Sequence, residues 1–252
     1  MEKIFSSPQQ EVLYGSSDTA ISKQLSRWER TGMIRKIAPR LYTANMEESP
    51  EVIVRRNLFA ILGNLYPGAM LSHRSALEFQ PTATGQLFLT YKYTRRATLP
   101  GITIRFLQGT GSIEGDNPIS GELYVSQRER ALLENFQVSR QQGPDAKVLP
   151  LPKVEERLEQ IIRVNGEEAL NQVRDRAQQI AEQLGMEREF ARLNTVISAM
   201  LTTHPSKILT SPVAAARAFG LPYDPARLEL FETLFQELSQ QEFNYREEKN
   251  TS

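Results

Sequence analysis

The sequence predicts an α+β protein with three parts: an N-terminal winged helix-turn-helix, a central small mixed α/β domain and a C-terminal all-α helical bundle. Three observations predict this arrangement. Near the N-terminus, an amphipathic helical pattern is followed by a basic turn and an aromatic strand. The middle of the chain carries β-prone runs separated by glycine and proline. From Lys153 onward, apolar residues recur at a period near 3.6, which is typical of packed helices.

Length supports more than one folding unit. The chain has 252 residues, whereas a typical domain holds about 100–150. We expect a DNA-binding domain over 1–46, a central domain over 51–150 and a helical domain over 151–245. The first boundary lies in a polar stretch that contains Pro50, and the second lies in a loop rich in glycine and proline before Lys153.

Composition excludes several classes of protein. Hydrophobic residues make up 40% of the chain and charged residues 24%, which is typical of a globular protein. Thirty basic and thirty acidic residues give a net charge of zero, so any binding to nucleic acid must come from a local basic surface. There is no cysteine and there are only two histidines, so we expect no metal site and no cofactor. No signal peptide or membrane-spanning segment is evident, and we expect a cytoplasmic protein without a membrane partner.

The N-terminal part is expected to begin with a short first helical segment over 8–14, which Gly15 and two serines end. A second helix follows, because Ile21, Leu25 and Trp28 recur at helical spacing and Gly32 stands where a helix would stop. Beyond it, residues 33–45 predict two short strands around a turn at 38–40, which would form a wing.

The central part is predicted to open with a helix over 50–66 and a shorter one over 71–76. Three β-prone runs follow, over 86–94, 101–109 and 121–126, and a helix over 126–139 closes the domain. The rest of the chain is predicted to be helical, in segments over 154–165, 166–185, 187–203, 212–220 and 225–240.

A polar and basic surface is predicted on the helix that precedes the wing. An α-helix fits the major groove of DNA, and side chains near its N-terminus reach the base edges. The residues expected to contact the groove are Thr19, Ser22, Lys23, Ser26, Arg27 and Arg30. The residues expected to contact phosphates are Arg35, Lys36 and Arg40.

The charge excess in this region is modest. Residues 2–45 contain seven basic and four acidic side chains. The alternative interpretation is therefore an ordinary amphipathic helix with a solvated charged face, followed by an ordinary hairpin. The order of the elements, more than their charge, favours the winged helix.

Residues 17–45, SDTAISKQLSRWERTGMIRKIAPRLYTAN, resemble the N-terminal winged helix of the AbiEi-type antitoxins. These antitoxins repress their own operons and counter a nucleotidyltransferase toxin. Residues 67–79, PGAMLSHRSALEF, are similar to the second part of the same proteins. The resemblance implies a DNA-binding regulator and places the predicted basic residues and Tyr42 on its winged helix.

Nearly the whole chain is also similar to the regulatory region that precedes the Fic domain in some bacterial Fic-family proteins. The shared segments include LSHRSALEFQPT, SQRERALLEN and SPVAAARAFGLPYDPARLELFETLF. The catalytic Fic signature HPFxxGNGR is missing, because His204-Pro205 is followed by SKILT. The AMP-transferring activity of that family therefore cannot be carried over to this chain.

Two histidines remain as candidate catalytic groups. His73 stands near Arg74 and Glu78, so a base beside a carboxylate is conceivable, but a packing role is favoured. His204 stands near the end of a predicted helix, where it would interact with the helix dipole. We expect no catalytic residue and no enzymatic activity.

These observations predict a bacterial DNA-binding transcriptional regulator of the antitoxin type that recognises double-stranded operator DNA. A homodimer would place two recognition helices on an inverted repeat. The alternative is a protein-docking module that restrains a toxin or a Fic-family partner without DNA. A third hypothesis, an enzyme in the central domain, would need a convergent polar pocket. The salt dependence of DNA binding distinguishes the first two.

Overall fold

The N-terminal part consists of one helix and a small antiparallel sheet. The computed structural model describes residues 11–139 and 141–203. The elements of this part are β1 (Val12–Tyr14), α1 (Thr19–Arg30), β2 (Arg35–Ala38) and β3 (Leu41–Thr43). The strand order is β1-β3-β2, with β3 antiparallel to both neighbours. The predicted helix and both predicted wing strands are therefore confirmed as elements.

The first helical segment expected over 8–14 is wrong for residues 12–14, which form β1. Valine, leucine and tyrosine favour strands, and β3 offers a partner with Leu13 opposite Tyr42. Only four residues separate β1 from α1, too few for another helix. Within the described residues, α1 therefore has no preceding helix with which to form a helix-turn-helix.

The central part is built on a six-stranded mixed sheet. Its strands are β4 (Met70–Leu71), β5 (Gln86–Tyr91), β6 (Arg95–Leu99), β7 (Ile102–Gln108), β8 (Asn117–Ser120) and β9 (Leu123–Val125). The strand order is β6-β7-β5-β4-β9-β8. The pairs β5–β7 and β4–β9 are parallel, and the other neighbours are antiparallel.

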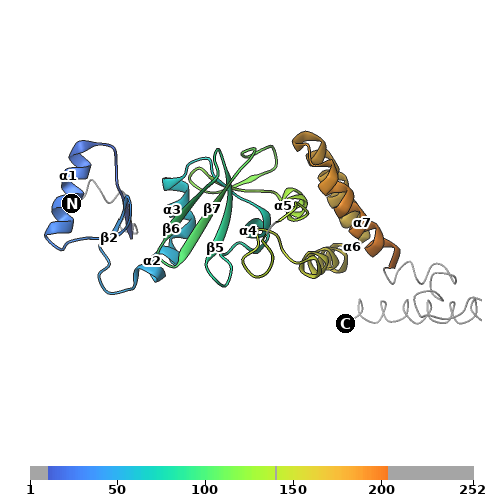
Figure 1. Ribbon diagram of the computed structural model, residues 1–252, viewed down its shortest axis with the longest axis horizontal. Coiled ribbons are helices and arrows are strands. Elements are labelled where there is room, and N and C mark those ends of the chain that lie inside the picture. Colours follow the sequence, from blue (N-terminus) through green and yellow to red (C-terminus); the bar gives the residue numbers. More distant parts are fainter. Residues whose placement is uncertain (1–10, 140, 204–252) are drawn as a thin grey trace, which may run out of the picture. The chain divides into compact units, whose positions relative to one another are not determined.

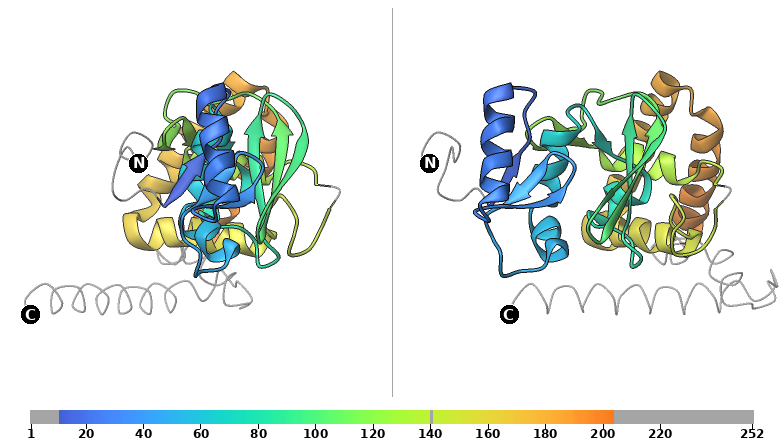
Figure 2. Two further views of the ribbon diagram at one scale, coloured as in Figure 1. Left: turned by 90° about the vertical axis from the view of Figure 1, so that its left-hand side faces the viewer. Right: turned by 60° about the vertical axis from the view of Figure 1, so that its left-hand side comes forward.

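Four helices cover this sheet. They are α2 (Pro50–Arg56), α3 (Leu58–Leu65), α4 (His73–Glu78) and α5 (Arg128–Asn135). Figures 1 and 2 show α3 on one face of the sheet and α4 and α5 on the other. The sheet is therefore the middle layer of a three-layer arrangement, which buries apolar side chains on both of its faces.

One predicted helix is divided in the structure. The helix expected over 50–66 breaks at Asn57, whose backbone leaves the helical region with φ −105° and ψ 14°. The Asn57 side chain donates to the Ile53 carbonyl at 2.9 Å and to Glu11 Oε2 at 2.6 Å. Asparagine favours helix ends because its side chain competes for backbone hydrogen bonds.

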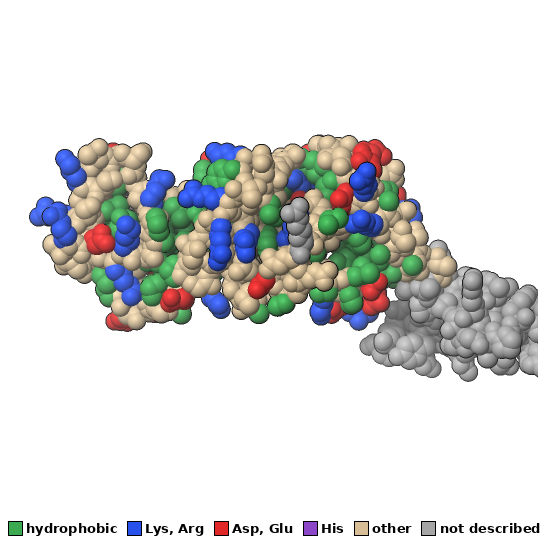
Figure 3. Space-filling model, in the orientation of Figure 1, with side chains coloured by type: hydrophobic (Ala, Val, Ile, Leu, Met, Phe, Trp, Pro, Cys, Tyr) green, Lys and Arg blue, Asp and Glu red, His purple; other side chains and the backbone are tan. Residues whose placement is uncertain are grey.

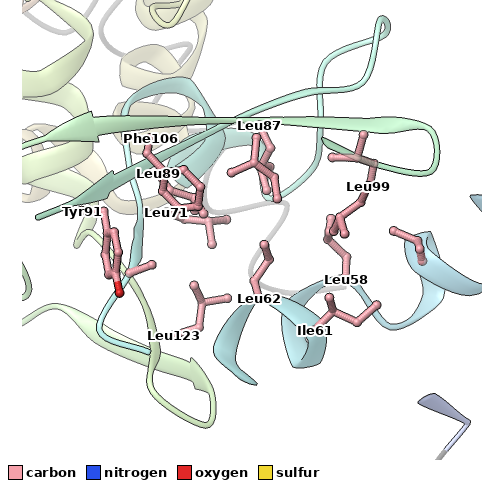
Figure 4. Packing of buried hydrophobic residues seen from close by; sticks show 14 of the residues in the cluster. Leu58, Ile61, Leu62, Leu71, Leu87, Leu89, Tyr91, Leu99, Phe106 and Leu123 are labelled. Carbon is pink, nitrogen blue, oxygen red and sulfur yellow. The ribbon is translucent and has the colours of Figure 1, made fainter. Parts of the chain in front are cut away.

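The main core lies between α3 and the sheet (Figure 4). Ile61 and Leu62 of α3 are fully buried, as are Leu87 and Leu89 of β5. The same cluster includes Val12, Ala38 and Leu41 from the N-terminal sheet. The N-terminal sheet and the central part therefore share one hydrophobic core.

The C-terminal described region is helical, as predicted. It contains α6 (Leu151–Leu184) and α7 (Glu187–Thr203). Gly166 interrupts α6 with φ 83° and ψ 174°, a conformation that glycine alone adopts readily. This break separates the helices predicted over 154–165 and 166–185. The helices predicted over 212–220 and 225–240, and His204, lie outside the described residues.

The chain divides into two compact units. In the described residues, the first contains 11–154 and 175–190, and the second contains 155–174 and 191–203. This division does not follow the three predicted domains, since the N-terminal and central parts fall in one unit. Among the described helices, none has the length and apolar character needed to cross a membrane.

Candidate nucleic-acid interface

Local hydrogen bonds fix both ends of α1. Asp18 caps the N-terminus, where its Oδ1 accepts from the Ala20 amide at 2.7 Å. At the C-terminus, Gly32 is left-handed with φ 71°, the Gly32 amide donates to the Glu29 carbonyl, and the Met33 amide donates to the Trp28 carbonyl at 2.9 Å. These two bonds form a Schellman motif, which explains why the helix ends where the glycine predicts.

One face of α1 is anchored in a small apolar cluster. Leu25 is 1% exposed and packs with Leu13 of β1 and Ile34, and Ile21, Trp28 and Tyr42 pack around them. This cluster holds the helix against the sheet of the N-terminal part. The orientation of α1 is therefore set by tertiary packing as well as by its caps.

The opposite face of α1 carries the six residues predicted to contact the groove. All six are exposed: Thr19, Ser22, Lys23, Ser26, Arg27 and Arg30. At 3.6 residues per turn they fall within an arc of roughly 140° around the helix axis, away from the buried face. Figure 3 shows Lys and Arg side chains standing out from the surface over α1. The structure thus brings these residues together on one free surface.

Two of the six also make local hydrogen bonds. The Ser22 hydroxyl donates to the Ser16 carbonyl at 2.8 Å, which ties the second turn of α1 to the residues before it. Arg30 Nε donates to the Ser26 carbonyl at 3.3 Å. Because the Ser22 hydroxyl proton is used in the bond to the Ser16 carbonyl, its oxygen can only accept a hydrogen bond from a partner.

The three basic residues predicted to contact phosphates have different surroundings. Lys36 on β2 is exposed. Arg35 is half-buried, donates through Nη2 to the Glu48 carbonyl and leaves its buried Nε without a partner. Arg40 is exposed but donates to the Gly15 carbonyl through Nε at 3.3 Å and Nη2 at 3.2 Å. Lys36 is therefore the freest of the three, while Arg35 and Arg40 also hold the local structure together.

Gly15 explains the position of Arg40. The backbones of Gly15 and Arg40 approach so closely that a Cβ on Gly15 would lie 3.0 Å from the Arg40 Cα. The Gly15 amide donates to the Arg40 carbonyl at 2.8 Å, and Arg40 has a left-handed φ of 62°. The sequence pattern gave no sign of this contact, because it joins residues 25 positions apart.

An ion-pair cluster missed by the sequence pattern connects the N-terminal sheet to α2. Arg56 of α2 donates to the carboxylates of Glu11 and Glu48, with Nε to Glu11 Oε2 at 3.0 Å and Nη1 to Glu48 Oε1 at 3.1 Å. Asn45 Nδ2 also donates to both carboxylates. The hydrogen bond from Arg56 lowers the pKa of Glu11 to about 2 and lowers that of Glu48 as well. We call Glu11, Asn45, Glu48 and Arg56 the Arg56 clamp.

The described residues offer no cluster of three or more histidine and carboxylate side chains that could hold a metal ion.

Comparison with known protein families, with curated proteins and with solved structures finds no match to this chain.

Proposed function

We propose that the chain is a DNA-binding transcriptional regulator of the antitoxin type, in which α1 enters the major groove and the β2–β3 hairpin acts as a wing. The observation that carries the proposal is the free polar and basic face of α1, opposite an apolar face that fixes the helix. A helix held in this way loses little conformational entropy when it binds a groove. The resemblance of residues 17–45 to AbiEi-type antitoxins supports the same proposal.

The residues of α1 divide by position. Thr19, Ser22 and Lys23 lie in the first half of the helix, where side chains reach base edges when a helix enters the groove with its N-terminus. Arg27 and Arg30 lie in the last turn and are suited to phosphates on the groove wall. Lys36 on the hairpin supplies a further phosphate contact. In this proposal, Arg35 and Arg40 contribute mainly by positioning the hairpin.

A homodimer would place two copies of α1 on an inverted repeat. Successive major grooves on one side of B-DNA are about 34–36 Å apart, so the two half-sites would have that separation or a multiple of it. Two copies would double the phosphate contacts, which raises affinity and steepens its salt dependence.

The test is a fluorescence-polarisation titration of the full chain against a duplex from the region upstream of its own gene and against a scrambled duplex. Each titration is run at about 50 mM and about 200 mM salt. We expect preferential binding to the upstream duplex that weakens steeply with salt. Arg27→Ala should weaken binding by about 1–3 kcal/mol. It should also reduce the slope of log K against log salt concentration by about one, because one counterion fewer is released.

Two control variants distinguish the loss of a DNA contact from a change in net charge and from a loss of folding. Arg163→Ala removes an exposed arginine from α6, and Gln24→Ala alters an exposed polar residue of α1 outside the proposed contact face. Both should bind DNA like the unmodified protein, with equal melting temperatures throughout. Unchanged affinity in Arg27→Ala, or an equal loss in Arg163→Ala, contradicts the assignment. Absence of binding to either duplex favours the alternative, a protein-docking module that holds a toxin or Fic-family partner.

A further inference from the structure

The central part contains a polar cavity that DNA binding by α1 does not use. Its volume is about 350 Å³, which is within the range of sites for small molecules. Residues of β5, α4, α5 and the loop before α6 form the walls, and the polar ones that matter here are His73, Thr90, Arg130, Glu134, Gln137 and Lys147. Every lining residue belongs to the first compact unit. We call this the Lys147 cavity.

Its inner wall is a network of buried charges centred on Arg130. Arg130 is 2% exposed and donates through Nε to Glu134 Oε1 at 3.0 Å and through Nη1 to Asp116 Oδ2 at 2.6 Å. It also donates through Nη2 to the Thr110 carbonyl at 2.6 Å and through Nη1 to the Gly111 carbonyl at 2.9 Å. Four of its five N–H groups are therefore used, and Arg130 forms a rigid support for the wall.

Glu134 is similarly occupied. In addition to Arg130, it accepts from the His73 amide at 2.8 Å and from the Ser126 hydroxyl at 3.3 Å, both through Oε2. Its two oxygens thus have three donors in all, with Oε1 on Arg130 and Oε2 on His73 and Ser126. Glu134 is therefore held by the wall itself.

His73 is a buried neutral imidazole on the same wall. Its Nε2 lies 3.0 Å from Gln137 Oε1 and its Nδ1 lies 3.0 Å from the Ser72 hydroxyl. Burial lowers the pKa of His73, so the ring is neutral at neutral pH. An amide oxygen only accepts, so Nε2 carries the proton and Nδ1 accepts from Ser72. The packing role predicted for His73 agrees with this arrangement, although its carboxylate neighbour is Glu134, whereas Glu78 pairs with Arg74.

Lys147 is the cation of the wall that has no carboxylate in direct contact. Its Nζ donates to Gln137 Oε1 at 3.0 Å, and within the described part of the chain no carboxylate lies at ion-pair distance from it. An ammonium group has three protons, so two remain available to the cavity. Burial lowers the pKa of Lys147, and the attraction of Glu134 and Glu189 opposes this shift.

Thr90 supplies a second unused donor. Its side chain is 5% exposed and lines the cavity, yet among the hydrogen bonds of residues 11–139 and 141–203 none involves its hydroxyl. The oxygen itself is accessible from the cavity, since the only fully buried side-chain nitrogen or oxygen without a partner in the described residues is Arg35 Nε. The Thr90 hydroxyl is therefore free to donate to a group inside the cavity.

We infer that the Lys147 cavity binds the carboxylate or phosphate group of a small molecule, with the Lys147 ammonium as counter-ion and the Thr90 hydroxyl as a second donor. Lys147 would meet the negative charge of the ligand, because it is the one cation of the described lining without a carboxylate at ion-pair distance. The site is independent of α1 and of the proposed DNA binding.

The test is isothermal titration calorimetry of the full chain at constant ionic strength, with inorganic phosphate in one arm and succinate in the other. Binding of phosphate alone identifies a phosphate site, binding of succinate alone a carboxylate site, and binding of both a general oxyanion site. Lys147→Met keeps the side-chain length and removes the charge, and should weaken binding by about tenfold or more. Thr90→Val removes the hydroxyl at nearly constant shape and should weaken it by a smaller factor.

Lys92→Met is the matched control, since Lys92 is exposed and lies outside the cavity lining. It should bind like the unmodified protein. Melting temperatures without ligand establish that each variant is folded. The inference is overturned if neither anion binds the unmodified protein, or if Lys147→Met and Lys92→Met bind with equal affinity.

Discussion

Arg130 shows how one residue can hold several elements of the central part together. It joins α5 to the loop after β7 through two carbonyls and to the residue before β8 through Asp116. The Asp116 carboxylate is fully buried and that of Glu134 is 5% exposed, so both depend on this arginine for compensation.

Arg130→Met should therefore destabilise the protein by about 3–5 kcal/mol, because it leaves buried carboxylates without their partner. The measurement is equilibrium unfolding in urea. Arg128→Met on the same helix is the control: its own side chain is 52% exposed, although that of its partner Glu129 is 13% exposed, so the expected loss is about 1 kcal/mol. Equal losses in the two variants would contradict the role given to Arg130.

The Arg56 clamp makes a prediction about acid stability. The pKa of Glu11 falls from 4.5 in the unfolded chain to about 2 in the folded protein. A lowered carboxyl pKa contributes stability that is fully present above the unfolded value and is lost as the pH falls through the folded value. Glu11→Gln should therefore be less stable than the unmodified protein at neutral pH.

The difference between the two proteins should shrink as the pH falls from about 4.5 to about 2. Thermal melting at a series of pH values measures it, with Glu47→Gln, an exposed residue outside the clamp, as control. A difference that stays constant across this range would show that Glu11 does not titrate against Arg56.

At the scale of elements, the close packing of α3 against β8 predicts that replacing a helical glycine with alanine lowers the stability of the protein. Replacing a helical glycine with alanine normally stabilises a helix by up to about 1 kcal/mol. A Cβ on Gly63, however, would lie 2.2 Å from the Ser120 carbonyl oxygen. Gly63→Ala should therefore destabilise the protein by about 1–3 kcal/mol, because α3 and β8 must move apart.

Chemical denaturation measures this change. Gly111→Ala is the control, since a Cβ there has no neighbour within 4 Å and the backbone φ is not positive. It should leave the midpoint nearly unchanged. A stabilised Gly63→Ala protein would mean that α3 and β8 do not approach as closely as described.

The elements that the sequence predicts well are those with a strong local signal. Periodic apolar residues predict α1 and both halves of α6, and Gly32 marks the end of α1. The unpredicted strands lack such a signal: β4 has two residues, β6 carries two arginines and β8 contains proline at the sheet edge. They are strands because a neighbouring strand pairs with them, which a local pattern does not reveal.

In the candidate interface, too, local patterns were predictable and tertiary contacts were not. Exposure of the six residues on α1 follows from helical periodicity and was predictable. The internal partners of Arg35 and Arg40 were not, since Glu48 and Gly15 reach them through tertiary contacts. The Lys147 cavity was also beyond prediction, because it gathers side chains from positions 73 to 186.

At the scale of the molecule, the domain boundaries were the least predictable feature. The polar stretch before Glu51 indicated a linker, yet Val12, Ala38 and Leu41 share a core with α2 and α3. Likewise, residues 175–190 belong to the first compact unit although they follow the predicted second boundary. Buried Ala177, Ile180 and Ala181 are typical of a helix in any domain, so their pattern cannot say which core they join.

The Arg56 clamp has a consequence for how α1 meets any partner. A recognition element on a loose tether samples many orientations, and each of them is given up when a complex forms. Here the carboxylates of Glu11 and Glu48 fasten the strand before α1 and the segment after β3 to the same arginine. The orientation of α1 is thus fixed when the protein folds. A complex with its free face should therefore form with a small loss of conformational entropy, and a misaligned target should bind poorly.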